Sequence, residues 1–202
     1  MKNPPCCRRW FMLLCILLIS VLCYSAAYAG TQIDETNFPD AIFRKYVSDE
    51  FDADEDGWLI PDEIEAVTSI QCYYSDISSL KGIEHFTSAT ELLCFGNKLT
   101  ELDLSQNTAL TSLNCFNNEL TSLDVSMLPN LTSLICSYNK LSELDISHCP
   151  VILDMVKKRK PAPESGVLYW AIDESFHGRN YHYSALNIDQ NVKLYTGDEA
   201  GQ

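Results

Sequence analysis

Six acidic side chains lie within the twelve residues from Asp52 to Glu63, DADEDGWLIPDE, around a single glycine. Carboxylates at positions one, three, five and twelve, with glycine at six, are typical of a calcium-binding loop, because Ca²⁺ takes several oxygen ligands around a sharp turn. The pattern predicts a Ca²⁺ site made of four carboxylates and one backbone carbonyl: Asp52, Asp54, Asp56, Trp58 and Glu63. A water would fill the ninth position, where Ile60 has no donor. The alternative, an acidic surface turn, explains the composition but not this order.

Two helices are predicted to position the loop. Residues 37–51 fit an amphipathic helix that carries Pro39 in its first turn. Its apolar side consists of Ile42, Phe43, Tyr46, Val47 and Phe51. A second helix begins at Pro61 and leads into the following residues without a linker. Because sensor proteins carry such loops in pairs and this chain has one, we expect residues 30–66 to form a calcium-stabilised N-terminal cap.

Residues 67–151 contain four copies of one repeat, at 67–88, 89–109, 110–130 and 131–151. The shared pattern is L-x-x-L-x-C-x-x-N-x-L-x-x-L-D-[LVI]-S. Alternating apolar positions predict a short strand in each copy, with one side pointing inward. One copy cannot bury its own leucines, so we expect the copies to stack around a continuous core with their strands in a parallel sheet.

This pattern resembles that of leucine-rich repeat proteins, most closely the exported bacterial type with 21-residue repeats and cysteine at the third inward position. The resemblance covers residues 67–151 and implies an α/β-type solenoid, curved, with its parallel strands on the concave face. The first copy departs from the pattern, because Ser75 stands in the asparagine column and residues 81–83 include one extra residue. We therefore expect the first copy to be an end coil.

Two further columns recur at the repeat spacing. The cysteine column holds Cys72, Cys94, Cys115 and Cys136. It indicates a small apolar ladder in the core rather than disulfides or a metal site, because no histidine or Cys-x-x-Cys pair accompanies it. Cys149 lies in another column and is expected to be buried in a turn. The asparagine column, Asn97, Asn118 and Asn139, is expected to hydrogen-bond the turn backbone of its own coil and of the next one.

The first 29 residues have the order of a secretory signal peptide: basic residues, an apolar run at 11–23, and small residues ending in Ala27-Tyr28-Ala29. A retained membrane anchor is the alternative, but the run of 13 residues is shorter than the roughly 20 that a bilayer requires. After cleavage, 11 basic residues would remain against 28 acidic ones, a net charge near −17. Such a charge argues against nucleic acid or an anionic membrane as partner.

The repeat frays after residue 151. Ile152 and Met155 are expected to continue the apolar columns for half a coil, before a breaker-rich loop at 157–166. Aromatic and β-branched residues at 167–173 and 181–196 predict two or three strands, separated by residues 174–180. Residues 152–202 are therefore expected to form a small β-rich C-terminal cap, with a second binding module as the alternative.

No motif for catalysis stands out. The four histidines have no zinc-binding spacing, and no nucleophile elbow, phosphate loop or dinucleotide turn is present. We therefore expect a protein that is not an enzyme. A carbohydrate-active enzyme that uses Asp173 of the C-terminal segment is the least favoured alternative.

The outward positions of the expected strands carry more large apolar groups than a solvated sheet would. The predicted ligand-binding residues of the concave face are Tyr73, Leu93, Phe95, Phe116, Ile135 and Tyr138. Such a surface is typical of interaction sites. It favours a secreted or cell-surface monomer, not inserted in a membrane after cleavage, that recognises or adheres to a protein, or else a glycan. The alternatives are that flanking segments cover part of this face, or that the repeat is a spacer without its own ligand.

Overall fold

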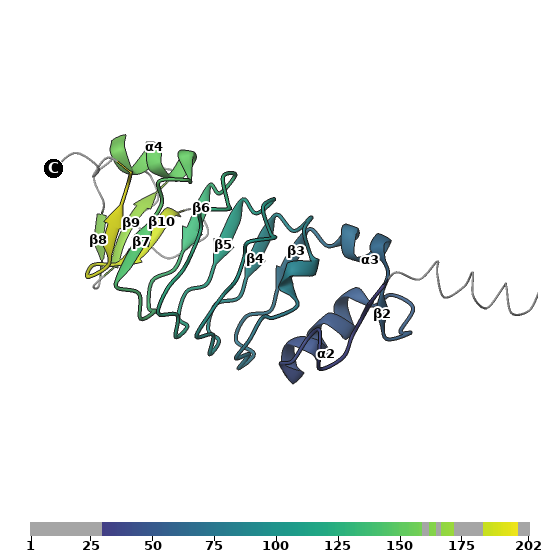
Figure 1. The fold of residues 1–202 in the computed structure, drawn as a ribbon. Coiled ribbons are helices and arrows are strands. Elements are labelled where there is room, and N and C mark those ends of the chain that lie inside the picture. The colour runs from purple at the N-terminus through teal and green to yellow at the C-terminus, as the bar shows by residue number, and fades with distance from the viewer. Residues whose placement is uncertain (1–29, 159–161, 165–166, 172–183, 198–202) are drawn as a thin grey trace, which may run out of the picture.

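The computed structural model describes residues 30–158, 162–164, 167–171 and 184–197. The predicted signal peptide and Asp173 lie outside these ranges. Within them, stacked coils form a row of parallel strands, with a helical unit at the N-terminal end and a mixed unit at the C-terminal end (Figure 1). None of the helices in these ranges is both long enough and apolar enough to cross a membrane.

The N-terminal unit consists of α2 (Ala41–Phe51) and α3 (Pro61–Ala66), with the acidic loop and β2 (Trp58–Leu59) between them. The helix α2 begins later than expected, because Asp40 caps it by accepting hydrogen bonds from the backbone amides of Ile42 and Phe43 at 2.9 and 3.0 Å. Pro39 therefore precedes the helix instead of lying in its first turn. Ile42 is 45% exposed and does not belong to the buried side of α2, contrary to expectation.

The repeats form four strands in parallel and in register: β3 (Ser69–Gln71), β4 (Glu91–Leu93), β5 (Ser112–Asn114) and β6 (Ser133–Ile135). Each strand has one central inward residue, and these residues stack directly: Ile70, Leu92, Leu113 and Leu134. The first coil also contains a short 3₁₀ helix, η1 (Ile83–His85). The apolar residues of the cap and of all coils belong to one continuous core. The prediction of a stacked parallel sheet is confirmed.

The cysteine column is a buried ladder of free thiols, as predicted. Burial raises the pKa of Cys72 and of Cys115 to about 12, so that both thiols stay protonated near neutral pH. Cys149 is also buried, and its Sγ donates to the backbone carbonyl oxygens of Val125 and Leu128. These cysteines therefore act as small apolar side chains.

The asparagine column ties each turn to the turn before it. The Nδ2 of Asn97 donates to the backbone oxygens of Cys72, in the preceding coil, and of Cys94, in its own coil, at 2.7 and 3.0 Å. Asn118 and Asn139 repeat this arrangement one and two coils further on. The predicted hydrogen bond to the turn of each asparagine's own coil is confirmed. The other hydrogen bond goes to the preceding coil, and not to the next coil as predicted.

The C-terminal unit contains strands within the predicted ranges 167–173 and 181–196, but it also contains a helix and a fifth coil that were not predicted. The helix α4 (Pro150–Lys158) occupies the place where Ile152 and Met155 were expected to continue the repeat. The strands β10 (Ser184–Asp189) and β11 (Lys193–Tyr195) then pair in parallel with β6 and with β7 (Glu143–Asp145) of the fourth coil. Residues 184–195 thus stack as a contracted coil.

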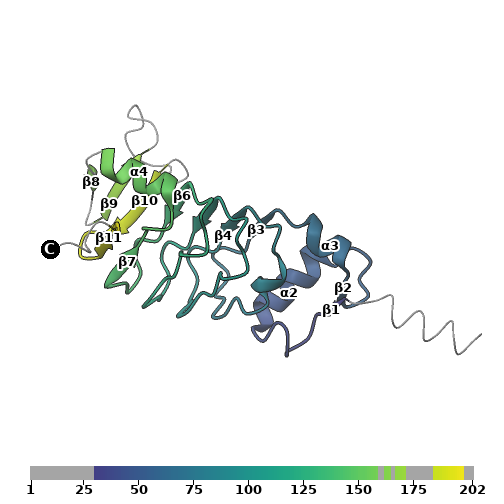
Figure 2. The ribbon, with the colours of Figure 1, turned by 45° about the horizontal axis from the view of Figure 1, so that its top comes forward.

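An antiparallel pair extends the main sheet beyond this fifth coil. The strand order is β3-β4-β5-β6-β10-β9-β8, where β9 is Val167–Ala171 and β8 is Ala162–Glu164. Figure 2 shows α4 beside β10 at this end of the molecule and α2 at the other end. A helix therefore lies near each end of the row of coils.

Candidate functional site

The acidic loop brings three of the five predicted calcium ligands together. Carboxylate oxygens of Asp52, Asp54 and Glu63 lie within 4.8 Å of one another. Asp56 lies in the same loop but does not join this group, and its Oδ1 accepts a hydrogen bond from the Trp58 amide at 2.8 Å. Desolvation and the neighbouring carboxylate of Asp56 raise the pKa of Asp54.

Backbone amides hold the two end carboxylates of the loop in place. The buried carboxylate of Asp52 accepts from the amides of Asp56 and Gly57 at 3.2 and 3.0 Å. Glu63 accepts from Ala53 and Ile60 at 2.8 and 3.0 Å. Gly57 has a φ of +82°, which a residue with a side chain adopts only at a cost. The loop is therefore closed by its own hydrogen bonds around a set of hard oxygen donors.

The single loop has a pairing partner within the same chain. The strand β1 (Thr31–Gln32) pairs antiparallel with β2, and Thr31 lies opposite Leu59, the eighth residue of the loop. In paired calcium loops a second loop occupies that place. The start of the described chain substitutes for it here, which the sequence pattern did not predict.

The cap is fixed to the first coil by polar and aromatic contacts. Asp40 Oδ2 accepts from the amide and the hydroxyl of Ser78 at 2.8 and 2.7 Å. Although burial alone would raise it, the pKa of Asp40 is lowered by hydrogen bonds from the amides of Phe43 and Ser78. Phe86 of the first coil packs against Phe51, with 5.1 Å between the ring centroids. The acidic loop, α2 and the first coil are thus one packed unit.

We call the outward-pointing side of the sheet the strand face. Five aromatic side chains lie along one edge of it. We call this set the aromatic rim; it consists of Tyr73, Tyr74, Phe95, Phe116 and Tyr138. Tyr73 and Phe95 stack in parallel at 4.7 Å and 6°. Tyr74 meets Phe95 edge-on at 5.1 Å, and Tyr138 meets Phe116 at the same distance.

The residue two positions after each cysteine of the ladder adopts a left-handed conformation. This column holds Tyr74, Gly96, Asn117 and Tyr138, with φ values of 48°, 69°, 53° and 56°. Glycine and asparagine tolerate that region, whereas bulky side chains rarely adopt it. Tyr138 was expected on a strand, and Tyr74 was not among the predicted ligand-binding residues. The glycine and the asparagine in this column were the signal that a turn begins here.

Two predicted residues of this face are not available to a ligand. Leu93 is 8% exposed and Ile135 is 2% exposed, whereas Tyr73 is 42% exposed. Neither Leu93 nor Ile135 belongs to the main core cluster, which agrees with their outward direction. Outward direction was thus predicted correctly, but their exposure was not. The large apolar and aromatic side chains that this face exposes are Tyr73, Tyr74 and Tyr138 of the aromatic rim.

Together the parallel strands, the inward leucine columns and the asparagine turns define a leucine-rich repeat solenoid. No model of a protein family matches the chain. Internalin J of Listeria monocytogenes is 42% identical over 71 residues, which are 35% of this chain and 8% of that protein. The chain therefore spans a small part of the curated relative that it matches.

Two solved structures from the same organism share the fold. The functional domain of InlJ from Listeria monocytogenes, described as including a cysteine ladder, has a TM-score of 0.57 and 40% identity over 62% of this chain and 28% of its own. The internalin InlF has a TM-score of 0.54 and 26% identity, over 62% of this chain and 37% of its own. The repeats of this chain are thus similar to those of internalins.

Proposed function

We propose that this chain recognises a protein partner through its aromatic rim, with a calcium-stabilised cap holding the first coil in place. The proposed setting is the cell surface or the extracellular medium, in keeping with the predicted signal peptide and the acidic charge. The similarity to internalins supports a recognition role, and the proposal involves no catalytic step. A solenoid that serves as a spacer without its own ligand is the competing function.

One observation carries the recognition role. Tyr74 and Tyr138 occupy left-handed turn positions while their side chains are 68% and 48% exposed. Such a backbone costs about 1–2 kcal/mol for a residue with a side chain. A large aromatic residue at a strained and exposed position contributes little to the core. Its value is at the surface, where tyrosine is enriched among the residues that dominate binding energy.

The rim is also pre-organised for binding. The ring of Tyr74 lies over Gly96, where a Cβ atom would come within 2.3 Å of the ring. Phe95 contacts both Tyr73 and Tyr74. Because these neighbours already restrict the exposed rings, a partner would lose less side-chain entropy on ordering them.

The calcium role is supported by the convergence of Asp52, Asp54 and Glu63. These residues, with Asp56 and the carbonyl of Trp58, would hold the ion, and a bound Ca²⁺ would neutralise carboxylates that otherwise repel one another. Loops of this kind in extracellular modules bind Ca²⁺ with Kd values of about 10⁻⁴ to 10⁻³ M. Ambient extracellular calcium would keep such a site loaded.

The recognition role is tested with the double variant Tyr74→Asn/Tyr138→Asn. Asparagine tolerates the left-handed region, so the thermal stability should be equal to or higher than that of the wild type. Immobilised wild-type protein is used to capture partners from a cell-surface extract. The captured protein is then identified, purified and titrated against both forms. We expect the double variant to bind at least tenfold more weakly.

A matched control is Met127→Asn, which removes an exposed apolar side chain away from the rim; Met127 is 52% exposed. This variant should bind like the wild type. Equal binding by the wild type and the rim variant would refute the role of the rim. If no captured protein binds the chain after purification, the spacer function is favoured over the recognition function.

A further inference from the structure

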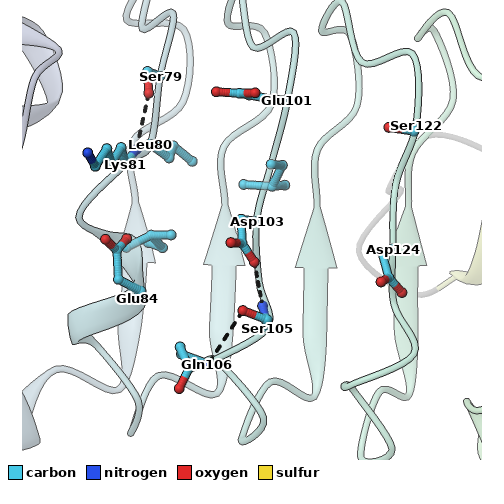
Figure 3. A pocket seen from close by; sticks show the side chains of 12 residues that line it. Ser79, Leu80, Lys81, Glu84, Glu101, Asp103, Ser105, Gln106, Ser122 and Asp124 are labelled. Atoms are coloured by element: carbon cyan, nitrogen blue, oxygen red, sulfur yellow. Dashed lines mark hydrogen bonds between the residues drawn. The ribbon is translucent and has the colours of Figure 1, made fainter.

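Two hollows lie on the face of the solenoid opposite the strands β3 to β6, and the second of them is lined in part by β7 and β11. The first has a volume of about 650 Å³ and extends from Ser79 to Asp124 across the first three coils. The second, of about 490 Å³, extends from Thr121 to Tyr195. Both are lined by Ser122 and Asp124, so the two hollows adjoin along the solenoid axis; we call the pair the return groove. Figure 3 shows its first part on the coil segments in front of the strand layer.

The return groove has an apolar floor. One leucine from each of the four repeat coils lines it: Leu80, Leu102, Leu123 and Leu144. These side chains belong to the core cluster, and Leu102 and Leu123 keep 9% and 7% of their surface exposed. The floor is therefore the outer side of the hydrophobic core, within reach of a side chain that enters the groove.

Carboxylates line the sides of this floor, and few cations balance them. The acidic lining residues are Glu84, Glu101, Asp103, Asp124, Glu143 and Asp145. Lys81 is the one lysine that lines either hollow, and His148 lies at the far end. No ion pair among the described residues includes Glu101, Asp103 or Asp124. The return groove therefore combines an apolar floor with uncompensated negative charge.

The aspartates of this groove stay ionised. Hydrogen bonds from the amides of Ser105 and Ser126 lower the pKa of Asp103 and of Asp124. The donor–acceptor distances are 2.9 and 2.8 Å. Each aspartate uses one oxygen in this way, so its charge remains available to a partner. These turns explain why an aspartate follows the floor leucine in the second, third and fourth coils. Glu84 likewise accepts from the Gly82 amide at 2.7 Å, whereas no such turn accounts for Glu101.

From this groove we infer a second binding site, for an extended peptide segment of a partner protein in which lysine or arginine alternates with apolar residues. The apolar residues would lie on the leucine floor. The basic side chains between them leave the opposite face of the extended peptide, and their long stems would reach over the sides to the carboxylates. Coils repeat at about 4.8 Å, so four coils span about 14 Å, the length of about four extended residues. The site lies opposite the aromatic rim and does not depend on the proposed recognition there.

The geometry of the groove favours a peptide over a metal ion. The described residues contain one group of carboxylates close enough to share an ion, and it is the loop group of Asp52, Asp54 and Glu63. The carboxylates of the groove are instead distributed coil by coil, as the separate positions of Asp103 and Asp124 in Figure 3 illustrate. A ligand that matches them must carry its positive charges at intervals. A peptide does so and can also cover an apolar floor.

The test uses labelled hexapeptides and fluorescence anisotropy with the purified chain. The probe alternates lysine with leucine, and the comparison peptide alternates lysine with serine. We expect the lysine–leucine peptide to bind more tightly, and its affinity to fall as salt rises because charges drive part of the binding. Equal affinity for both peptides would overturn the role of the leucine floor. Absence of binding would overturn the site.

Two groove variants separate charge from shape. Asp103→Asn/Asp124→Asn keeps an oxygen acceptor for each serine amide but removes two charges, and should weaken binding about three- to tenfold. Ser122→Tyr, at the exposed position shared by both hollows, should block the groove and abolish binding. Unchanged binding by either variant would refute the site.

The matched charge control is Asp34→Asn/Asp49→Asn, which removes two charges from the N-terminal unit. Asp34 also caps a turn, because its Oδ1 accepts from the amides of Thr36 and Asn37. This control should bind within about twofold of the wild type, since surface charges at a distance are screened. An equal loss of peptide affinity in the control and in the groove variant would show that only the overall charge matters, and would overturn the inference.

Discussion

The phenolic oxygen of Tyr46 accepts a hydrogen bond of 2.8 Å from the backbone amide of Gln71. Gln71 ends β3, which is the edge strand of the seven-stranded sheet. Edge strands leave backbone groups unpaired on their outer side, where they invite pairing with other chains. The cap thus satisfies one of these groups with a side chain of α2. It also ties α2 to the strand that leads to Tyr73 and Tyr74.

We expect Tyr46→Phe to lower the free energy of unfolding by about 1 kcal/mol, because it removes one hydrogen-bond acceptor and keeps the ring. For a chain of this size the melting temperature should fall by about 2–4 °C, measured by circular dichroism. Tyr74→Phe is the control, since the described residues make no hydrogen bond to its hydroxyl. An equal loss in both variants would contradict the role of the Tyr46 hydroxyl.

Calcium should raise the melting temperature of the chain. At about 10 mM Ca²⁺ and a Kd of about 10⁻⁴ to 10⁻³ M, binding adds about 1.4–2.7 kcal/mol to the stability of the folded state. That corresponds to a shift of about 3–10 °C, reversed by a chelator. Mg²⁺ at the same concentration should shift the melting temperature less, because it prefers a smaller octahedral site.

Glu63→Gln identifies the site of this effect. The variant keeps one oxygen to accept from the Ala53 or the Ile60 amide but loses the bidentate charged ligand, so most of the calcium-induced shift should disappear. Asp34→Asn, outside the loop, should keep the full shift. A Glu63→Gln protein that responds to calcium like the wild type would show that the ion binds elsewhere.

Local patterns predicted the repeats because each column has one physical role. Inward leucines, the cysteine ladder and the asparagine turns depend on neighbours at a constant spacing, which is visible in the chain itself. The buried state of Leu93 and Ile135 was not predictable in this way. Their direction follows from strand alternation, but their exposure depends on what surrounds the strand face in three dimensions.

The fifth coil was missed for a related reason. Its apolar residues, Leu186, Ile188 and Val192, are buried like those of the earlier coils. The intervening residues 150–183 break the constant spacing, and Ile188 stands where the pattern has cysteine. Asn191 has the asparagine spacing from Leu186 but is exposed instead of buried. Asp189 ties this coil to the preceding turn in another way, by accepting from the amides of Tyr138 and Asn139 at 2.9 and 3.3 Å. A repeat search that requires the cysteine or an unbroken period cannot find such a coil.

The buried thiols predict a loss of stability in alkaline solution. Burial raises the pKa of Cys115 from an ordinary value of 9.0 to about 12 in the folded chain. Because the folded pKa is raised, the protonated thiol favours folding fully below pH 9, and this contribution is lost as the pH rises from about 9 toward 12. Each such thiol lowers the stability by about 1.4 kcal/mol per pH unit in that window.

Urea unfolding at pH 8 and pH 10 measures this effect. Cys115→Val removes one titrating thiol while keeping a small apolar side chain in the ladder. Its stability should therefore fall less steeply with pH than that of the wild type, by about 1.4 kcal/mol per unit above pH 9. Other groups that titrate in this range are common to both proteins and cancel in the comparison. Identical pH dependence would mean that the Cys115 thiol is not shielded in the folded state.

A double-mutant cycle between Tyr74 and Gly96 tests how the rim is held. In Gly96→Ala the new Cβ would meet the Tyr74 ring at 2.3 Å, and the backbone would be strained at a φ of +69°. We expect Gly96→Ala to lower the free energy of unfolding by about 2 kcal/mol in the wild-type background. Strain of the left-handed backbone accounts for about 1 kcal/mol of this. With Tyr74→Asn present the ring is gone, so Gly96→Ala should cost only the backbone term. The coupling of about 1 kcal/mol is measured by urea unfolding. Additive losses would show that Tyr74 can leave Gly96 without cost, and that the ring is not pre-organised.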